Sequence, residues 1–191
     1  MELLTGIMTA FGLSASAGLN AYIPLLVVGL LAHYTKWINL AKPWDTLANP
    51  WILILLGVLV IIEMLADKIP VVNHINDMIQ TVVRPVAGAI VFAASAQVVT
   101  DIHPVLALAS GLLVAGGVHA VKAGAVRPAI TATTGGTANV PVSIAEDIIS
   151  TVMSILAIIL PIIIGAIIIL TTALIIWWMW RRANRKQIHQ A

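Results

Sequence analysis

The stretch ATTGGTANVPVSIAEDI (residues 132–148) is the longest polar interruption in the second half of a very apolar chain. It carries two glycines, three threonines, an asparagine and a proline before two adjacent acids. Glycine and proline both disfavour a continuous helix. We therefore predict non-helical backbone that dips into or caps a membrane domain, followed by the acidic start of the last membrane span.

The sequence on either side of this stretch places the chain in the membrane class. Of the 191 residues, 60% are hydrophobic and only 9% are charged, whereas soluble domains carry about 25% charged residues. We predict an all-α, polytopic helical membrane protein, with residues 1–191 forming one integral membrane domain in the lipid bilayer. The composition gives no reason to expect binding to nucleic acid, and the absence of cysteine excludes thiol chemistry.

Five apolar segments predict about five spans. They cover residues 4–32, 51–66, 85–100, 104–121 and 148–180. A span needs about 20 helical residues, so the first and last segments are too long for straight helices. SASAGLN (residues 14–20) could interrupt the first segment and Pro161 could kink the last, which predicts re-entrant or broken helices.

The basic residues predict an orientation. Three tryptophans lead into RRANRK (residues 181–186), a pattern typical of a helix end at the cytoplasmic interface. We predict residues 180–191 as a basic cytoplasmic tail and the cell inner (plasma) membrane as the location. Five spans place the N-terminus outside, and a re-entrant first segment would move it to the side of the tail.

One similarity within the chain suggests a duplication, and a second suggests breaks in the helices. NDMIQTVV (residues 76–83) aligns with EDIISTVM (residues 146–153), which predicts a duplicated helical hairpin of the kind that small transporters use. SAGLNAYIP (residues 16–24) also resembles TTGGTANVP (residues 133–141). Both runs could expose backbone groups to a ligand through broken helices, or could simply let helices pack closely.

Acidic residues supply the candidate site. Glu63 interrupts an apolar segment, where a carboxylate must be protonated, paired or hydrated. Asp67 follows one turn later, so the two could share a cation or a proton. The alternative is that Glu63 pairs with Lys68 or Lys122 as an interhelical strut.

The other acids are predicted at helix starts. Asp77, Glu146 and Asp147 each precede an apolar segment, and Ser143 fits a capping box with Glu146. The predicted topology puts these acids on the same side as Glu63, which favours a shared site over separate caps. His119 could relay protons, bind a metal or act only in packing.

These considerations give one set of candidate residues. The predicted ligand- or ion-binding residues are Asn20, Glu63, Asp67, Asp77, His119, Asn139, Glu146 and Asp147, supported by the charges of Lys68, Arg84 and Lys122. The sequence does not single out a metal, a cofactor or a catalytic residue.

Three blocks carry a resemblance to a known family. GLSASAGLNAYIPLLVVGLLA, EMLADKIPVVNHINDMIQTVVRPVAGAIVFAA and TTGGTANVPVSIAEDI together resemble a bacterial integral-membrane family known as domain of unknown function 4126. The resemblance runs from about residue 12 into the last span. It implies one polytopic membrane domain and brings no activity.

The favoured hypothesis is a small membrane transporter or channel for an ion or small solute, with a cation or proton at a carboxylate-lined site. The alternative is a non-catalytic membrane scaffold or assembly partner, and either could form a homo-oligomer. A membrane enzyme with His119 or Asp147 as a base is a third hypothesis, but the sequence carries no enzyme motif that supports it.

Overall fold

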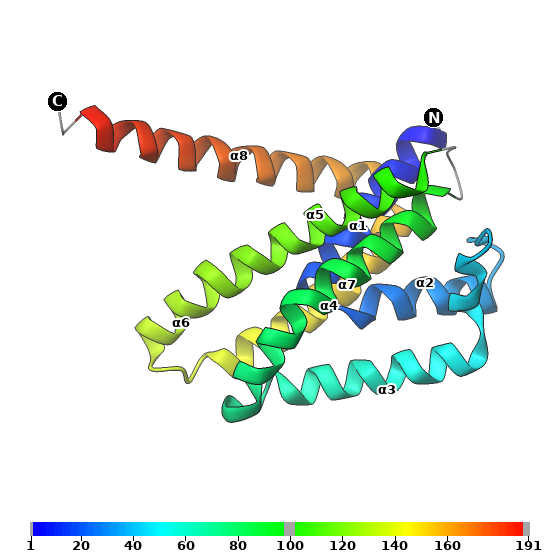
Figure 1. The fold of residues 1–191 in the computed structure, drawn as a ribbon, viewed down its shortest axis with the longest axis horizontal. Helices are drawn as coiled ribbons and strands as arrows, with labels where there is room; N and C mark the ends of the chain where they lie inside the picture. The colour runs from blue at the N-terminus through cyan, green and yellow to red at the C-terminus, as the bar shows by residue number, and fades with distance from the viewer. Residues whose placement is uncertain (1, 98–101, 189–191) are drawn as a thin grey trace.

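The computed structural model describes residues 2–97 and 102–188, and every regular element in them is helical (Figure 1). The elements in chain order are α1 (Glu2–Leu19), α2 (Tyr22–Tyr34), η1 (Trp44–Ala48), α3 (Pro50–Ala66), α4 (Pro70–Gln97), α5 (Pro104–Val121), η2 (Lys122–Val126), α6 (Arg127–Thr134), α7 (Asn139–Ile159) and α8 (Pro161–Ile188). Three stretches of the described chain are long and apolar enough to cross a membrane, namely Ile75–Ala96, Pro104–Thr134 and Asn139–Ile159. The prediction of an all-α, helical membrane protein is confirmed.

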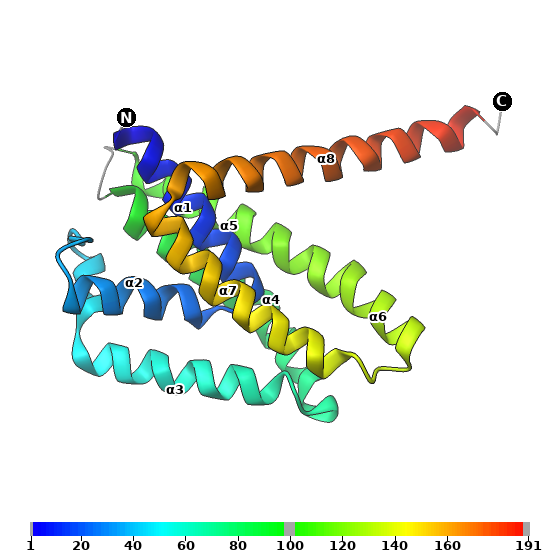
Figure 2. The same cartoon turned by 180° about the vertical axis from the view of Figure 1, so that it is seen from behind.

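The first apolar segment forms a helical hairpin rather than one continuous helix. Asn20 separates α1 from α2, and its Oδ1 accepts hydrogen bonds from the N–H groups of Tyr22 (3.2 Å) and Ile23 (3.1 Å). Trp37, which follows α2, lines the same pocket as Thr5 near the start of α1. The start of α1 and the end of α2 therefore lie at one end of the bundle, which is the arrangement that the re-entrant alternative predicts (Figures 1 and 2).

Helix α4 begins well before the predicted third segment. It starts at Pro70 and contains Pro85 in its interior, so the predicted start at residue 85 is wrong. Asn76, Gln80 and Arg84 lie four residues apart and are all buried, which makes them one inward face of a helix. The part of α4 before Pro85 contains polar residues because its inward face is polar, and its backbone is helical.

The stretch at residues 132–148 is mostly helical. After α5, one π-helical turn leads into α6, which ends at Thr134. Gly135 and Gly136 take φ values of +61° and +89°, which glycine adopts readily. Because α7 begins at Asn139, only the short turn between α6 and α7 matches the predicted non-helical backbone.

The predicted helix caps are wrong for the same reason. The residue that precedes α7 is Ala138, with no side-chain cap, so Ser143, Glu146 and Asp147 lie inside the helix rather than at its start. Asp77 likewise lies inside α4. These acids need another physical explanation than the helix dipole.

The fifth segment divides at the predicted place. Helix α7 ends at Ile159, α8 begins at Pro161, and α8 leaves the bundle in both views (Figures 1 and 2). On α8, Arg182 stacks over the Trp178 ring at 3.9 Å. The predicted break at Pro161 is confirmed.

Small residues let α1, α4 and α5 approach closely. A Cβ on Gly88 of α4 would overlap Ala115 of α5, and one on Gly111 of α5 would overlap the backbone of α4. Ser14 of α1 donates to the carbonyl of Gly111 at 2.8 Å. Such contacts are the usual source of helix association in membranes, where no hydrophobic effect drives helices together.

The two copies of the NDMIQTVV-like sequence occupy comparable places in this bundle. One lies in the first half of α4 and the other in the middle of α7. Each helix follows a turn at the same end of the bundle, after α3 and after α6 respectively (Figures 1 and 2). This arrangement is the one expected of parallel repeats, and the duplication stays a prediction.

Candidate functional site

Nine charged side chains meet beside the break between α1 and α2. We call them the charge cluster, and it comprises the carboxylates of Glu63, Asp67, Asp77, Glu146 and Asp147 and the cations of Lys68, Arg84, Lys122 and Arg127. They come from α3, α4, η2, α6, α7 and the turn between α3 and α4. Tertiary packing thus brings together charged residues that lie up to 84 positions apart in the sequence.

Arg84 is the fully buried centre of one half of the charge cluster. Its Nη2 lies 3.0 Å and its Nε 3.2 Å from Glu63 Oε1, and Nη2 lies 3.4 Å from Asp67 Oδ2. Neither Arg84 nor Glu63 has an exposed side chain. The strut alternative placed Lys68 or Lys122 beside Glu63, and this partner assignment is wrong because Arg84 occupies that place.

His119 completes the surroundings of Arg84. Its Nδ1 lies 3.1 Å from Arg84 Nη1, and its Nε2 lies 3.3 Å from Thr81 Oγ1. Arginine can only donate, so Nδ1 must accept and Nε2 carries the hydrogen. The imidazole is therefore neutral, and its Nδ1 already has a partner.

Asp67 has the most cationic surroundings. Its Oδ2 lies 3.1 Å from Arg127 Nη2 and 3.8 Å from Lys122 Nζ, and its Oδ1 accepts from Asn76 Nδ2 at 2.8 Å. Burial acts to raise the pKa of Asp67, but the charges of Lys122, Arg84 and Arg127 outweigh it and hold that pKa below its ordinary value. Asp67 is therefore ionised.

Arg127 is a member that the sequence analysis did not place in the site. Its Nη1 makes two bonds to the Asp77 carboxylate, at 3.0 and 2.9 Å. Arg127 lies five residues after Lys122, a spacing that an α-helix turns to a different face. The π-helical turn over Lys122–Val126 widens the helix and brings both cations to the same cluster. Helical periodicity alone would not have found it.

Asp147 connects the charge cluster to the break between α1 and α2. Its Oδ2 lies 3.2 Å from Lys68 Nζ, and its Oδ1 accepts from Asn20 Nδ2 at 3.0 Å. Lys68 also donates to the Met64 carbonyl at 2.8 Å. Because Asn20 caps α2 with its other side-chain atom, this one residue joins the helix break to α7.

The two helix ends at the break face opposite charges. Lys122 Nζ donates to the carbonyl of Leu19, the last residue of α1, at 3.0 Å. The carboxylate of Glu63 accepts from the N–H of Ala21 at 3.0 Å, just before α2. A cation at a helix C-terminus and an anion at a helix N-terminus are each favourable arrangements, so the charge cluster stabilises the broken backbone.

A line of buried hydroxyls extends from the charge cluster between α1 and α7. Ser16 Oγ lies 2.8 Å from Ser150 Oγ and 2.7 Å from Ser154 Oγ, and all three residues are fully buried. Ser150 Oγ also lies 3.1 Å from the Ser16 carbonyl. We call this line the serine seam. On α1 it begins one turn from Asn20, and on α7 it begins three residues from Asp147.

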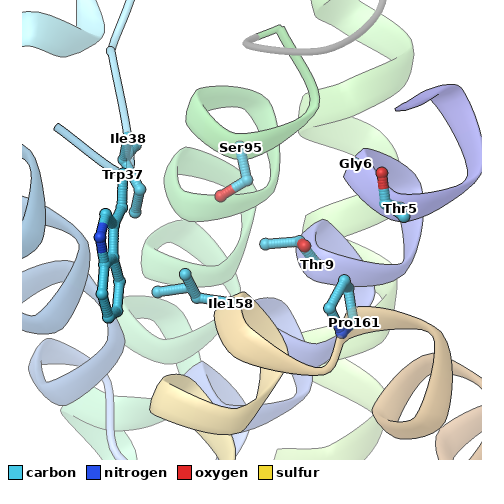
Figure 3. A pocket seen from close by; sticks show the side chains of 8 residues that line it. All are labelled: Thr5, Gly6, Thr9, Trp37, Ile38, Ser95, Ile158 and Pro161. Atoms are coloured by element: carbon cyan, nitrogen blue, oxygen red, sulfur yellow. The ribbon is translucent and has the colours of Figure 1, made fainter.

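A pocket of about 250 Å³ lies at the other end of the same helix pair. Figure 3 shows Thr5 and Thr9 on α1 facing it, with Ile158 and Pro161 from the junction of α7 and α8. Ile158 is one turn beyond Ser154 on α7. The serine seam thus ends one turn of α7 before a residue that lines this pocket.

Most of the predicted site residues meet, and one does not. Asn20, Glu63, Asp67, Asp77, His119, Glu146 and Asp147 lie in or beside the charge cluster, together with Lys68, Arg84 and Lys122. Asn139 lies apart, because its side chain bonds to Thr131 across the α6–α7 turn. Within the described chain, no group of three or more His, Cys, Asp or Glu side chains is arranged to hold a metal ion.

Apolar helices enclose a buried ionic cluster, and this arrangement places the chain in the class of α-helical polytopic membrane proteins. A family match over residues 7–182 then identifies the chain more closely: it belongs to the family described as Domain of unknown function (DUF4126). No curated protein and no solved structure matches the chain.

Proposed function

We propose that the protein is a small membrane transporter or channel that moves an ion or a small solute between α1 and α7. The charge cluster is its binding site, and the serine seam and the pocket at the other end form its path. The chain would lie in the cell inner (plasma) membrane, with residues 180–191 on the cytoplasmic side.

The observation that carries this proposal is the buried helix break at Asn20. Backbone that leaves helical geometry at membrane depth is tolerated where protein or water satisfies it, and broken helices with charged surroundings form the binding sites of many small transporters. Here the Leu19 carbonyl and the Ala21 N–H both face charged side chains. Lys122, beside the Leu19 carbonyl, lies where a transported cation would bind. Glu63, beside the Ala21 N–H, lies where a transported anion would bind.

The scaffold alternative draws on a different observation. Every carboxylate of the charge cluster lies within 4.0 Å of a cation, as expected of interhelical struts that specify one fold. A scaffold would keep a stable partner through purification and would carry no flux, whereas a transporter would carry flux as the isolated protein.

The test is flux across liposomes that contain the purified protein. Protons, monovalent cations, divalent cations and small organic ions form the panel, and Asp147→Asn is compared with wild type. We expect flux in wild type and its loss in Asp147→Asn, because this change removes the negative charge that pairs with Lys68 and leaves one acceptor oxygen for both Lys68 and Asn20.

Asp45→Asn is the matched control, since Asp45 is an exposed acid in η1, outside the charge cluster. Undiminished flux in a folded Asp147→Asn protein would exclude the charge cluster as the binding site. A folded wild type that moves no member of the panel, and that co-purifies with another protein, would favour the scaffold.

A further inference from the structure

The pocket of about 250 Å³ lies away from the charge cluster, where several elements begin or end. Its lining comes from Thr5, Gly6 and Thr9 in the first half of α1, Trp37 and Ile38 after α2, Ser95 near the end of α4, and Ile158 and Pro161 beside the junction of α7 and α8. Because the ends of membrane helices meet water, a water-soluble molecule can reach a pocket in this place.

Ser95 supplies a buried hydroxyl without a protein partner. The residue is only 8% exposed, and its Oγ makes no hydrogen bond within the described chain. Figure 3 shows this hydroxyl pointing from α4 toward the space that Ile158 borders. Ser14 and Ser16 on α1, by contrast, are each hydrogen-bonded. A buried polar group without a partner is costly, so a ligand that bonds to Ser95 would remove this cost.

Thr9 supplies a second such hydroxyl from another helix. It lines the pocket from α1, and its Oγ1 also makes no hydrogen bond in the described part of the chain. A hydroxyl group can both donate and accept. The hydroxyls of Thr9 and Ser95 therefore match a ligand whose own groups do both, which is the property of an alcohol.

The lining of the pocket carries no charge in the residues that the structure describes. Ile38, Ile158 and Pro161 are apolar, and Trp37 is aromatic. A charge moved from water into such surroundings without an opposite charge is strongly disfavoured. An uncharged alcohol exchanges its hydrogen bonds with water for bonds to the two hydroxyls, and its C–H groups can pack on the indole ring. The ligand should therefore be uncharged.

The volume of the pocket limits the ligand to a small molecule. A cavity of about 150 Å³ holds one benzene ring. About 250 Å³ should therefore hold roughly ten non-hydrogen atoms, on the same proportion. A pentitol such as xylitol is about this size, whereas a lipid with its acyl chains is much larger.

We propose that this pocket binds a small uncharged polyol, which hydrogen-bonds to the hydroxyls of Thr9 and Ser95 and packs its carbon chain on Trp37. The site is separate from the charge cluster and takes a different chemical class of ligand. Binding of the polyol stands independently, while its role as the transported solute rests on the proposed function.

Protection of a single thiol tests the binding. The chain has no cysteine, so Ile158→Cys would place its only thiol on the wall of the pocket and leave both hydroxyls in place. We expect xylitol at about 10 mM to slow the reaction of this thiol with a methanethiosulfonate reagent severalfold. Xylonate, the anionic counterpart of xylitol, should leave the rate unchanged. Thr137→Cys, in the turn between α6 and α7, is the control whose rate xylitol should not affect.

Ser95→Ala, made on Ile158→Cys, tests the hydrogen bond. Because Ser95 Oγ has no protein partner, its removal should leave the thermal unfolding temperature unchanged. The xylitol concentration that gives half-maximal protection should rise about tenfold, as expected for the loss of one hydrogen bond. Ser110→Ala on the same background is the matched control, since Ser110 of α5 does not line the pocket.

Three results would overturn the proposal. The first is a thiol that xylitol does not protect, and the second is equal protection by xylonate or in Ser95→Ala. The third is a thiol that reacts slowly without xylitol and faster once lipid is removed, which would place a lipid in the pocket.

Flux measurements distinguish failure of this proposal from failure of the proposed function. Protection by xylitol in a protein that carries no flux would establish the polyol site and refute transport. Ion flux that depends on Asp147, in a protein that xylitol neither protects nor crosses, would keep transport and refute the polyol site. Xylitol flux that Ser95→Ala reduces would support both, with the polyol as the transported solute.

Discussion

Arg84 is the residue on which the charge cluster depends most. It is fully buried and contacts Glu63, Asp67 and His119. Arg84→Met would leave the buried Glu63 carboxylate without its cation, and breaking a buried ion pair in this way costs about 3–5 kcal/mol. We expect a large fall in thermal unfolding temperature in detergent. A second change, Glu63→Leu, made on Arg84→Met should recover part of it. If Arg84→Met alone were as stable as wild type, the burial of the Arg84–Glu63 pair would be contradicted.

The charged surroundings of Asp67 predict how the stability of the folded protein changes with pH. Its pKa is below the ordinary value when folded, because the charges around it outweigh its burial. A group of this kind adds stability above its unfolded pKa of about 3.9, and loses it as the pH falls through the folded pKa. The unfolding temperature of wild type should therefore exceed that of Asp67→Asn near neutral pH. The difference should shrink as the pH drops below about 4, and a constant difference would argue against an ionised Asp67.

The contact between α4 and α5 depends on two glycines. A Cβ on Gly111 would overlap the carbonyl of Gly88 and the backbone of Ala89, which cannot move without separating the helices. We expect Gly111→Ala to destabilise the protein by about 1–3 kcal/mol, as overpacked cores do. Gly117→Ala on the same helix is the control, because its Cβ would meet nothing within 4 Å. That change should be neutral or stabilising by up to about 1 kcal/mol, as measured by thermal unfolding.

Hydropathy and proline positions predicted the apolar elements well. The bounds of α3 and α5 fall within one residue of the predicted segments, and Pro161 divides α7 from α8 as expected. The start of α4 was missed because Asn76, Gln80 and Arg84 lower the mean hydropathy of a helix that is helical all the same. Average polarity cannot distinguish a polar helix face turned inward from a loop, whereas the four-residue spacing of these side chains can.

The candidate site was predictable in its membership but not in its pairing. Buried charge in an apolar chain has few stable solutions, so the acids and cations could be expected to meet. Their partners depend on how helices from distant parts of the chain pack, as with Arg84 and Glu63. Arg127 required the π-helical turn, and Asn139 was included because its local sequence resembles that of Asn20, although its contacts differ.

The arrangement of the whole molecule predicts which positions face the same side of the membrane. The α1–α2 hairpin returns to its starting end, so residues near the start of α1 and residues after α2 lie together. The turn between α6 and α7 lies at the opposite end of the bundle (Figures 1 and 2). A single first span would instead separate the start of α1 from the residues after α2.

The absence of cysteine from the chain makes this arrangement measurable. Leu4→Cys, Lys36→Cys and Thr137→Cys would each give a single thiol, and a membrane-impermeant maleimide added to sealed vesicles labels only thiols on the outer side. We expect Leu4→Cys and Lys36→Cys to label alike and Thr137→Cys to label oppositely. His103→Cys, at the start of α5, is the control that should follow Lys36→Cys under either topology. Opposite labelling of Leu4→Cys and Lys36→Cys would mean that the first segment crosses the membrane once, and Asn20 would then not mark the tip of a hairpin beside the charge cluster.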